Sequence, residues 1–545
     1  MMAVFKVLCS LLGLLTVVDA HAQVQLGKAT LVGRDVSDTV QFFGAIPFAD
    51  PPLGQLRLKP PVLKTRLPPA VFNATAYGKA CIQPPDEEGV SPPQSEDCLF
   101  INVYRPSSVP LTRKLPILFW TYGGSFTTGS STIFDGKDLV ARSIKRGTPM
   151  IYVNFNYRLG PLGFPQGQEA DDKRALNLGI LDQIAALEWV QANIHAFGGD
   201  EDKVTISGES AGAIMTGVLF LNPHLGRLAR AGILESGSPN GIAANPASRN
   251  EAAWKSFVEK VPSCAGVAGT AETFSCLKNA TTDDIAAAVH QSISQSLSPV
   301  WAPTLDPGRG GLIPDYPSRL YEKGYFSRLP FIAGTNTDEG TLFSIQQPLT
   351  DELLKGILIS EYSPAATSIA ELTSVADTLL KLYPADPTVG SPYGTGDELF
   401  GLPASYKRVA SVVGDVNFDA PRRQWARAAA KAGVKSYGYH FTQPQPVPAL
   451  GVYHSAEIVY VYAQPPPTDP TGQTISSIIA DYWISFTVSL NPNDGKGVKR
   501  PNWPQYTTTN QVLLQLEAGN TTTVKDDFRK DQIDFLIKNS LVLRR

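Results

Sequence analysis

Short apolar, β-favouring runs alternate with segments that carry apolar residues at helical spacing along much of this chain. Between the second and third runs, residues 175–194 place Leu181, Ile184, Leu187 and Ile194 at the spacing of a helix. This alternation predicts an α/β fold, a mostly parallel central sheet with helices on both faces. The predicted strands are 115–120, 150–155, 204–207, 232–234, 330–333 and 437–441.

The third of these strands stops at the sequence Gly208-Glu209-Ser210-Ala211-Gly212, and a run of small and apolar residues follows. A strand that turns abruptly into a helix lifts a serine Oγ clear of the backbone, and flanking glycines give it room. The turn at 197–200 and the predicted helix at 211–220 supply that context. We therefore predict that Ser210 is a nucleophile, with an ordinary strand-to-helix turn as the alternative.

A second glycine turn, Tyr122-Gly123-Gly124-Ser125-Phe126, follows the predicted strand 115–120. Acyl transfer places negative charge on a former carbonyl oxygen, and fixed backbone N–H groups stabilise that charge. After an elbow of this kind, one donor is the amide of Ala211 and the others come from the glycine turn. The turn is the predicted oxyanion hole, and a plain turn is the alternative.

A nucleophilic serine needs a general base, and the chain has six histidines. His454 is the candidate that remains, in a loop after the strand 437–441, in the order Ser, acid, His that follows an elbow. The other five are less suitable. His21 lies in the leader, His195 precedes the nucleophile and His224 follows it closely. His290 lies in a predicted helix and His440 in a strand.

The acid of such a site should lie between Ser210 and His454, just after a strand. The loop after 330–333 offers Asp338 and Glu339, and Asp306 is a third candidate whose alternative is a turn aspartate. Either carboxylate of the first pair could orient an imidazole and stabilise its charged form. The residues alone leave this choice open.

Composition excludes several classes of protein. The 545 residues are 43% hydrophobic, and they contain no Gly/Ser linker, charge block or fixed-period repeat, which predicts a single domain over residues 23–545. A net charge of −3 with scattered Lys and Arg gives no basic face for nucleic acid. An ester-like or lipid-like small molecule is the expected partner.

The first 22 residues have the pattern of a signal peptide. Lys6 precedes an apolar run at 7–18, and an A-x-A sequence ends at Ala22. A retained membrane anchor is the alternative, but the run is about half of what a bilayer requires, and no later segment approaches a span. We expect a secreted, extracellular protein.

Cysteines and sequons agree with export. Without Cys9 of the leader, four cysteines remain, and we expect two local disulfides, Cys81 to Cys98 and Cys264 to Cys276, rather than reduced thiols or a metal site. Three sequons are candidate N-glycosylation sites: Asn73, Asn279 and Asn520.

Three longer motifs resemble the type-B carboxylesterase/lipase family, the α/β-hydrolase branch that includes cholinesterases, secreted fungal lipases and sterol esterases. They are the sequence 96–104 (EDCLFINVY), the sequence 156–158 (NYR), and the stretch from the turn at 197–200 through the elbow at 208–212. The resemblance covers nearly the whole chain and implies an α/β-hydrolase fold with large loop insertions.

The resemblance also implies roles for single residues. It selects Ser210, Glu339 and His454 as the catalytic triad, and Gly124, Ser125 and Ala211 as the oxyanion hole. It implies the same disulfides and two structural ion pairs, Glu96 with Arg57 and Asp182 with Arg158. No metal or organic cofactor is required.

Two departures from the family pattern concern the substrate. Ser125 stands where the family usually has a third glycine, so a positive φ there would cost strain. The loop between Cys81 and Cys98, which corresponds to the family's lid, is short, Pro-rich and acidic, with no aromatic residue inside. Since cholinesterases use an aromatic residue in this loop to bind a quaternary ammonium, cholinesterase activity is disfavoured, and we expect weak interfacial activation.

The expected activity is hydrolysis of carboxylic esters by a lipase-like or sterol-esterase-like enzyme of broad specificity, through an acyl-enzyme on Ser210. Triglycerides, sterol or carotenoid esters and hydroxycinnamate esters all fit. A non-catalytic adhesion module and a serine peptidase with the same triad are the alternatives from other classes.

Overall fold

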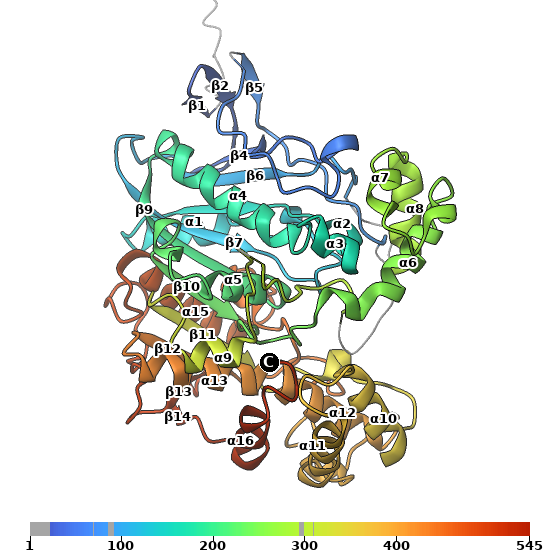
Figure 1. Cartoon of the computed structure of the whole chain (residues 1–545). Helices are drawn as coiled ribbons and strands as arrows, with labels where there is room; N and C mark the ends of the chain where they lie inside the picture. The colour runs from blue at the N-terminus through green and yellow to red at the C-terminus, as the bar shows by residue number, and fades with distance from the viewer. Residues whose placement is uncertain (1–21, 69, 86–91, 294–298, 309) are drawn as a thin grey trace, which may run out of the picture.

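The fold is built on a large twisted sheet, seen in Figure 1 with helices on both sides. The computed structural model describes residues 22–68, 70–85, 92–293, 299–308 and 310–545. In this part of the chain, eleven strands form the large sheet in the order β14-β13-β12-β11-β10-β9-β7-β8-β6-β4-β3, and three form a small sheet, β1-β2-β5. The strands are β1 Gln23–Leu26, β2 Ala29–Val32, β3 Arg34–Ser37, β4 Val40–Pro47, β5 Val71–Asn73, β6 Phe100–Pro106, β7 Leu115–Thr121, β8 Ile151–Phe155, β9 Gly199–Glu209, β10 Ala231–Glu235, β11 Phe331–Asn336, β12 Ser436–Phe441, β13 Val512–Leu516 and β14 Thr522–Lys525.

The centre of the large sheet is parallel, from β8 through β7, β9, β10, β11 and β12 to β13. These strands are buried on both sides, so they appear in the sequence as continuous apolar runs. All six strands predicted from the sequence lie here, and the fold class is confirmed. The strands towards each edge, β14, β6, β4 and β3, pair antiparallel.

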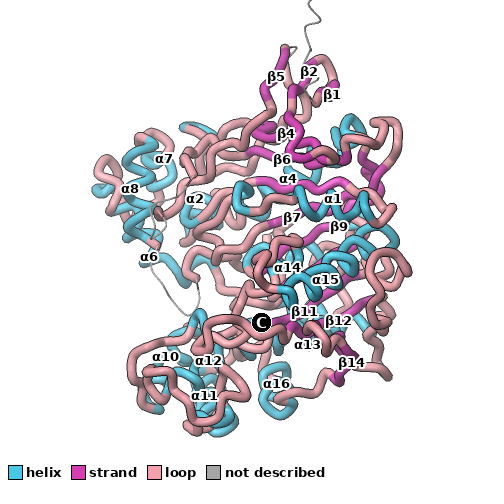
Figure 2. The backbone as a smooth tube through the Cα atoms, turned by 180° about the vertical axis from the view of Figure 1, so that it is seen from behind, coloured by secondary structure: helices cyan, strands magenta, loops and turns pink. Residues whose placement is uncertain are grey.

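Helices cover both faces of the sheet. In Figure 1, α4 and α5 lie in front of the strands, and α5 packs on β9 and β10. Figure 2 shows the opposite face, with α1 and α15 in front. The helices are α1 Lys137–Lys145, α2 Gly160–Gly163, α3 Gln168–Asp172, α4 Leu178–Asn193, α5 Ala211–Phe220, α6 Glu251–Glu259, α7 Thr273–Leu277, α8 Thr282–Ser292, α9 Pro317–Glu322, α10 Asp351–Glu361, α11 Ile369–Leu382, α12 Ser405–Gly414, α13 Ala420–Lys431, α14 Ile458–Val461, α15 Pro470–Ser489 and α16 Lys530–Lys538.

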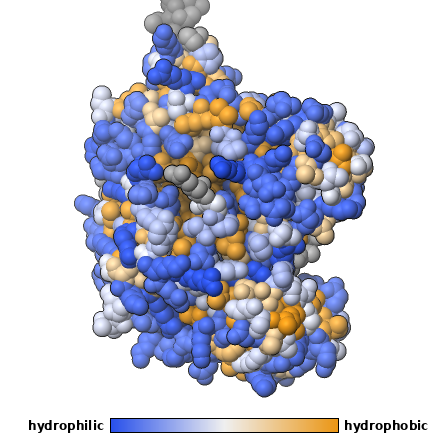
Figure 3. Space-filling model, in the orientation of Figure 1, coloured by the Kyte–Doolittle hydropathy of each residue, from blue (hydrophilic) through white to orange (hydrophobic). Residues whose placement is uncertain are grey.

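Two groups of helices stand to one side of the sheet in Figure 1, α6 to α8 above and α10 to α12 below. They are the loop insertions expected from the family resemblance. Figure 3 shows this face of the molecule, which is largely hydrophilic with apolar residues gathered in places, including over the lower group. In that group, Leu353 of α10 and Ile369 of α11 are more than half exposed. Among the described residues, no helix combines the length and the apolar character needed to cross a bilayer.

Candidate active site

The elbow after β9 has the geometry that the sequence predicts. Ser210 lies between β9 and α5 with φ 55° and ψ −127°, a strained conformation for a residue with a side chain. Its amide donates to the carbonyl of Glu235 at 2.9 Å, which fixes the turn to the next strand. Gly123 approaches so closely that a Cβ there would lie 2.8 Å from the Ser210 Cβ. The elbow therefore holds Ser210 against the second glycine turn.

Two other strand ends bring Glu339 and His454 to the elbow. Glu339 follows β11 and His454 follows β12, and the imidazole Nδ1 is 2.6 Å from Glu339 Oε2. Both side chains are almost completely buried. Phe343 and Phe418 pack on the imidazole, with ring centroids 5.1 and 4.7 Å away. The imidazole is thus oriented by one carboxylate and two aromatic rings.

The structure separates the three acid candidates. Glu339 contacts His454, whereas Asp338 accepts hydrogen bonds from Ser391 Oγ and from the amides of Tyr393 and Val452. Asp306 is half-buried in its own turn, and burial raises the pKa of its carboxyl. Of the three, Glu339 is the one that is placed to orient an imidazole.

His440, another histidine that follows the elbow, is a partly buried residue whose ring packs on Phe528, with centroids 4.9 Å apart. His440 lies in β12, and its Nε2 is 3.3 Å from Thr337 Oγ1. Burial, with the nearby charge of Arg529, lowers its pKa to about 3, so the ring is neutral. Its place in β12 agrees with the strand that the sequence predicts for it.

Residues that the sequence reasoning did not single out complete the site. Glu209, inside the elbow, has its Oε1 3.1 Å from His454 Nε2, at ion-pair distance but without the alignment of a hydrogen bond. Ser236 Oγ and the Asn336 amide both donate to Glu339 Oε1, at 2.6 and 2.7 Å. Glu457, three positions after His454, accepts from Asn336 Nδ2 at 2.6 Å. Glu209 was detectable as the variable residue of the elbow, but no spacing marks Ser236, Asn336 or Glu457.

These buried carboxylates change the protonation of the site. Burial alone would lower the pKa of His454, but the charges of Glu209 and Glu339 raise it to about 9. Burial raises the pKa of Glu209, against the opposite effect of His454. Burial, reinforced by the charge of Glu209, raises the pKa of Glu457 to about 8. The site therefore retains protons at neutral pH that isolated groups would lose.

The second glycine turn lies beside Ser210, which Gly123 contacts. Gly124, Ser125 and Phe126 all have positive φ, at 99°, 54° and 64°. The strain expected at Ser125 is therefore present, and it costs about 1–2 kcal/mol relative to glycine. Ala211 is the first residue of α5, so its amide is one of the N–H groups that the helix itself leaves unpaired.

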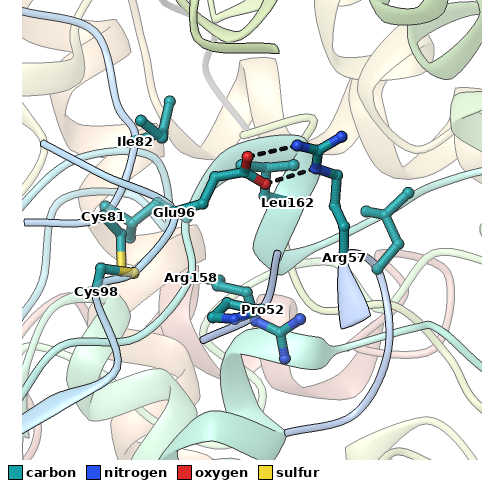
Figure 4. A pocket seen from close by; sticks show the side chains of 10 residues that line it. Pro52, Arg57, Cys81, Ile82, Glu96, Cys98, Arg158 and Leu162 are labelled. Atoms are coloured by element: carbon teal, nitrogen blue, oxygen red, sulfur yellow. Dashed lines mark hydrogen bonds and ion pairs between the residues drawn. A yellow bond between two sulfur atoms is a disulfide. The ribbon is translucent and has the colours of Figure 1, made fainter. Parts of the chain in front are cut away.

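The expected disulfides and ion pairs are present in the structure. Cys81 is bonded to Cys98, and Cys264 to Cys276. Figure 4 shows Arg57 and Glu96 paired beside the first disulfide, with two contacts of 2.6 Å. Arg158 makes a similar pair with Asp182, at 2.7 and 2.8 Å. Each pair is buried and has no contact with Ser210, which agrees with a structural role.

Other sequence predictions concern the surface and the ends of the chain. The three sequon asparagines, Asn73, Asn279 and Asn520, are exposed. Most of the predicted signal peptide, and residues 86–91 of the short Cys81–Cys98 loop, lie outside the described residues. β1 begins at Gln23, directly after the predicted cleavage point.

Comparison with known proteins identifies the family. The model of the carboxylesterase family matches residues 20–536, and the chain belongs to this family. A secreted triacylglycerol lipase of Gibberella zeae is 33% identical, with 96% of this chain and 91% of the relative covered. A secreted lipase of Botryotinia fuckeliana is 34% identical, with 94% and 91% covered. The crystal structure of Aspergillus niger EstA superposes with a TM-score of 0.82 at 26% identity, covering 96% of this chain and 99% of the other.

Family and fold together define the class of enzyme. The protein is a carboxylic ester hydrolase with the α/β-hydrolase fold. These comparisons support an ester-hydrolysing enzyme rather than the non-catalytic adhesion module considered from the sequence.

Proposed function

We propose that the protein is a secreted esterase of broad specificity, related to lipases and sterol esterases, that works through a Ser210-His454-Glu339 triad. The observation that supports this most directly is the meeting of three strand ends. His454 is 2.6 Å from Glu339 and lies at the elbow that presents Ser210. The names of the two fungal relatives, both secreted lipases, support the substrate class and the export.

In the proposed mechanism, His454 takes the proton of Ser210 as the hydroxyl attacks the ester carbonyl. Among the described residues, His454 Nε2 has no hydrogen-bond partner, so the bond between Ser210 Oγ and His454 would form when substrate binds. Glu339 stabilises the imidazolium. The alcohol leaves with that proton, and water repeats the sequence on the acyl-enzyme.

The oxyanion would be stabilised by the amides of Gly124, Ser125 and Ala211. Their value in catalysis is large, since the loss of one such donor costs about 10²- to 10³-fold in kcat. Because Ser125 carries a side chain in a turn that usually has glycine, we propose that it restricts the acyl groups that fit beside Ser210.

The proposal extends to processing. Residues 1–22 would be removed as a signal peptide, leaving residues 23–545 as one domain, with Asn73, Asn279 and Asn520 open to glycosylation. Triglycerides, sterol or carotenoid esters and hydroxycinnamate esters remain the candidate substrates. Rates across acyl chain lengths, measured beside a sterol ester and an aromatic ester, would separate them.

The nucleophile is tested by Ser210→Ala, which should fold normally and lose hydrolysis of a chromogenic ester. Ser207→Ala is a matched control, because Ser207 is a buried serine of β9, just before the elbow, and donates to the carbonyl of Phe119. The control should retain turnover. Hydrolysis by the Ser210 variant at the wild-type rate would overturn the assignment, and preferential cleavage of peptides by the wild type would favour a peptidase.

A further inference from the structure

We propose that Gln83 is a positioning residue that holds the oxyanion turn in its working shape. This inference rests on the proposed function, because it concerns the turn that would carry the donors Gly124 and Ser125. Gln83 lies two residues after Cys81, at the base of the loop closed by the first disulfide, and its side chain is buried.

The Gln83 carboxamide pairs with the backbone of one residue, Gly129. Its Nε2 donates to the Gly129 carbonyl at 2.9 Å, and its Oε1 accepts from the Gly129 amide at 2.7 Å. Nε2 also donates to the carbonyl of Cys81 at 3.1 Å. The side chain thus pairs both backbone groups of Gly129, its N–H and its C=O, as a neighbouring strand would.

The base of the loop gives Gln83 a rigid support. Beside the disulfide, the Ala80 amide donates to the Pro93 carbonyl and the Ser95 amide to the Ala80 carbonyl, both at 2.9 Å. The amide of Gln83 itself donates to the side chain of Gln94 at 3.0 Å. Because both sides of the loop base are tied together, the Gln83 carboxamide has little freedom to move away from Gly129.

Gly129 lies directly behind the oxyanion turn. Its φ is 115°, and a Cβ there would lie 2.9 Å from the Gly123 carbonyl oxygen and 2.6 Å from the Tyr122 ring. Gly123 in turn contacts Ser210. A continuous row of close contacts therefore runs from Gln83 through Gly129 and Gly123 to the proposed nucleophile.

The oxyanion turn needs such support, because three successive residues, Gly124, Ser125 and Phe126, are left-handed. Two of them carry side chains, so the turn is strained and persists only where its surroundings hold it. From inside, the amides of Thr127 and Thr128 close it on the Gly124 carbonyl at 3.0 Å. From outside, Gln83 holds Gly129, which follows the turn and packs against Gly123. Without that contact, the turn can relax and move its donors away from the oxyanion.

The test uses the secreted full-length enzyme with Gln83→Met, which keeps the length of the side chain and removes its hydrogen bonds. We expect kcat for a short-chain chromogenic ester to fall about 10- to 100-fold, because small misplacement of catalytic groups costs this much. KM should stay within about threefold. Affinity for a trifluoromethyl ketone, which forms a tetrahedral adduct with an oxyanion, should fall by the same factor as kcat.

Gln191→Met is the matched control for structural damage. Gln191 Nε2 also joins two backbone segments, through the carbonyls of Glu201 and Leu228 at 2.9 and 3.0 Å. The control should lower the melting temperature while leaving kcat and ketone affinity unchanged. If Gln83→Met fails to fold, Gln83→Asn keeps the amide but is too short to reach both atoms of Gly129, and it should show the same kcat loss.

Three results would overturn the inference: kcat and ketone affinity of the Gln83 variants within about twofold of the wild type, equal kcat losses in the Gln191 control, or a rise in KM with kcat unchanged. These outcomes differ from failure of the proposed function. If Ser210→Ala is inactive while the Gln83 variants are fully active, only the role of Gln83 is wrong. If Ser210→Ala retains turnover, the proposed nucleophile is wrong.

Discussion

In the buried ion pairs of Arg57 with Glu96 and of Arg158 with Asp182, each carboxylate faces its own guanidinium. At the candidate active site, by contrast, three buried glutamates surround the single imidazole of His454: Glu209, Glu339 and Glu457. Asp526 resembles the first group, since two arginines, Arg422 and Arg423, bind it. Burial would raise the pKa of Asp526, but the charge of Arg422 holds it well below its usual range.

The difference between these regions is one of charge balance. In the arginine pairs, each charge is matched and each carboxylate is held by well-aligned hydrogen bonds, which fixes loops to one another. At His454, the negative charges of Glu209 and Glu339 instead raise the pKa of the imidazole to about 9, and burial raises the pKa values of Glu209 and Glu457. Shifts of this kind are common in catalytic sites. The following predictions test this contrast, beginning with the largest effect.

Glu339→Gln should lower kcat about 10³- to 10⁴-fold, because a neutral amide cannot stabilise the imidazolium of His454. Ester hydrolysis and thermal unfolding, measured on the same preparation, check this, and the melting temperature should change little. Asp338→Asn is the control, since Asp338 holds loops through Ser391, Tyr393 and Val452. It should cost stability rather than kcat, and the reverse pattern would show that Glu339 is not the acid.

Arg158→Met should lower the free energy of unfolding by about 3–5 kcal/mol, because it leaves Asp182 buried without a partner. Denaturant titration measures this loss. The double variant Arg158→Met/Asp182→Leu should recover most of it, since a matched apolar pair removes the uncompensated charge. A single variant as stable as the wild type would show that balanced pairs do not hold this fold together.

Glu209→Gln should shift the acid limb of the kcat/KM profile to lower pH by about one unit. The base works as neutral imidazole, so wild-type activity should rise with pH towards the His454 pKa of about 9. Because the negative charge of Glu209 favours the imidazolium, its removal lowers that pKa and frees the base at lower pH. Glu188→Gln, on an exposed face of α4, should leave the profile unchanged. An unshifted profile for Glu209→Gln would mean that this carboxyl does not set the protonation of His454.

Ser236→Ala should have the smallest effect, a fall in kcat of about three- to tenfold, near 1 kcal/mol. It removes one of two donors to Glu339 Oε1, and the Asn336 amide remains. Ser238→Ala is the control, because Ser238 is equally buried and its Oγ has no partner among the described residues. Steady-state kinetics compares the two, and equal rates would assign Ser236 no part in orienting the acid.

Sequence patterns predicted six of the seven strands of the parallel centre, all except β13, and they did not predict the buried strand β6. The run 115–120 corresponds to β7 Leu115–Thr121, and 437–441 to β12 Ser436–Phe441, because central parallel strands leave continuous apolar stretches. The edge strands β3 and β14 were not predicted. Their residues are largely exposed and polar, so neither apolar runs nor clear alternation mark them.

The candidate site divides in a similar way. Ser210 and the glycine turn were predictable, because each depends on local backbone geometry that only certain residues allow. The choice between Asp338 and Glu339 depended on which carboxylate faces a histidine more than a hundred residues later, and only the family resemblance or the folded chain supplies that. The contacts of Gln83 and Glu457 likewise join segments that are distant in sequence, and no spacing predicts them.

The three proposed catalytic groups follow three different strands, β9, β11 and β12, on both sides of β10. No fragment that ends before residue 454 contains all three, and none of the groups can find the others unless the parallel centre of the sheet has assembled. Turnover is therefore a cooperative signal of the folded state. An assay of ester hydrolysis during refolding would report the completion of the sheet itself, and partly folded or truncated chains would be silent in it.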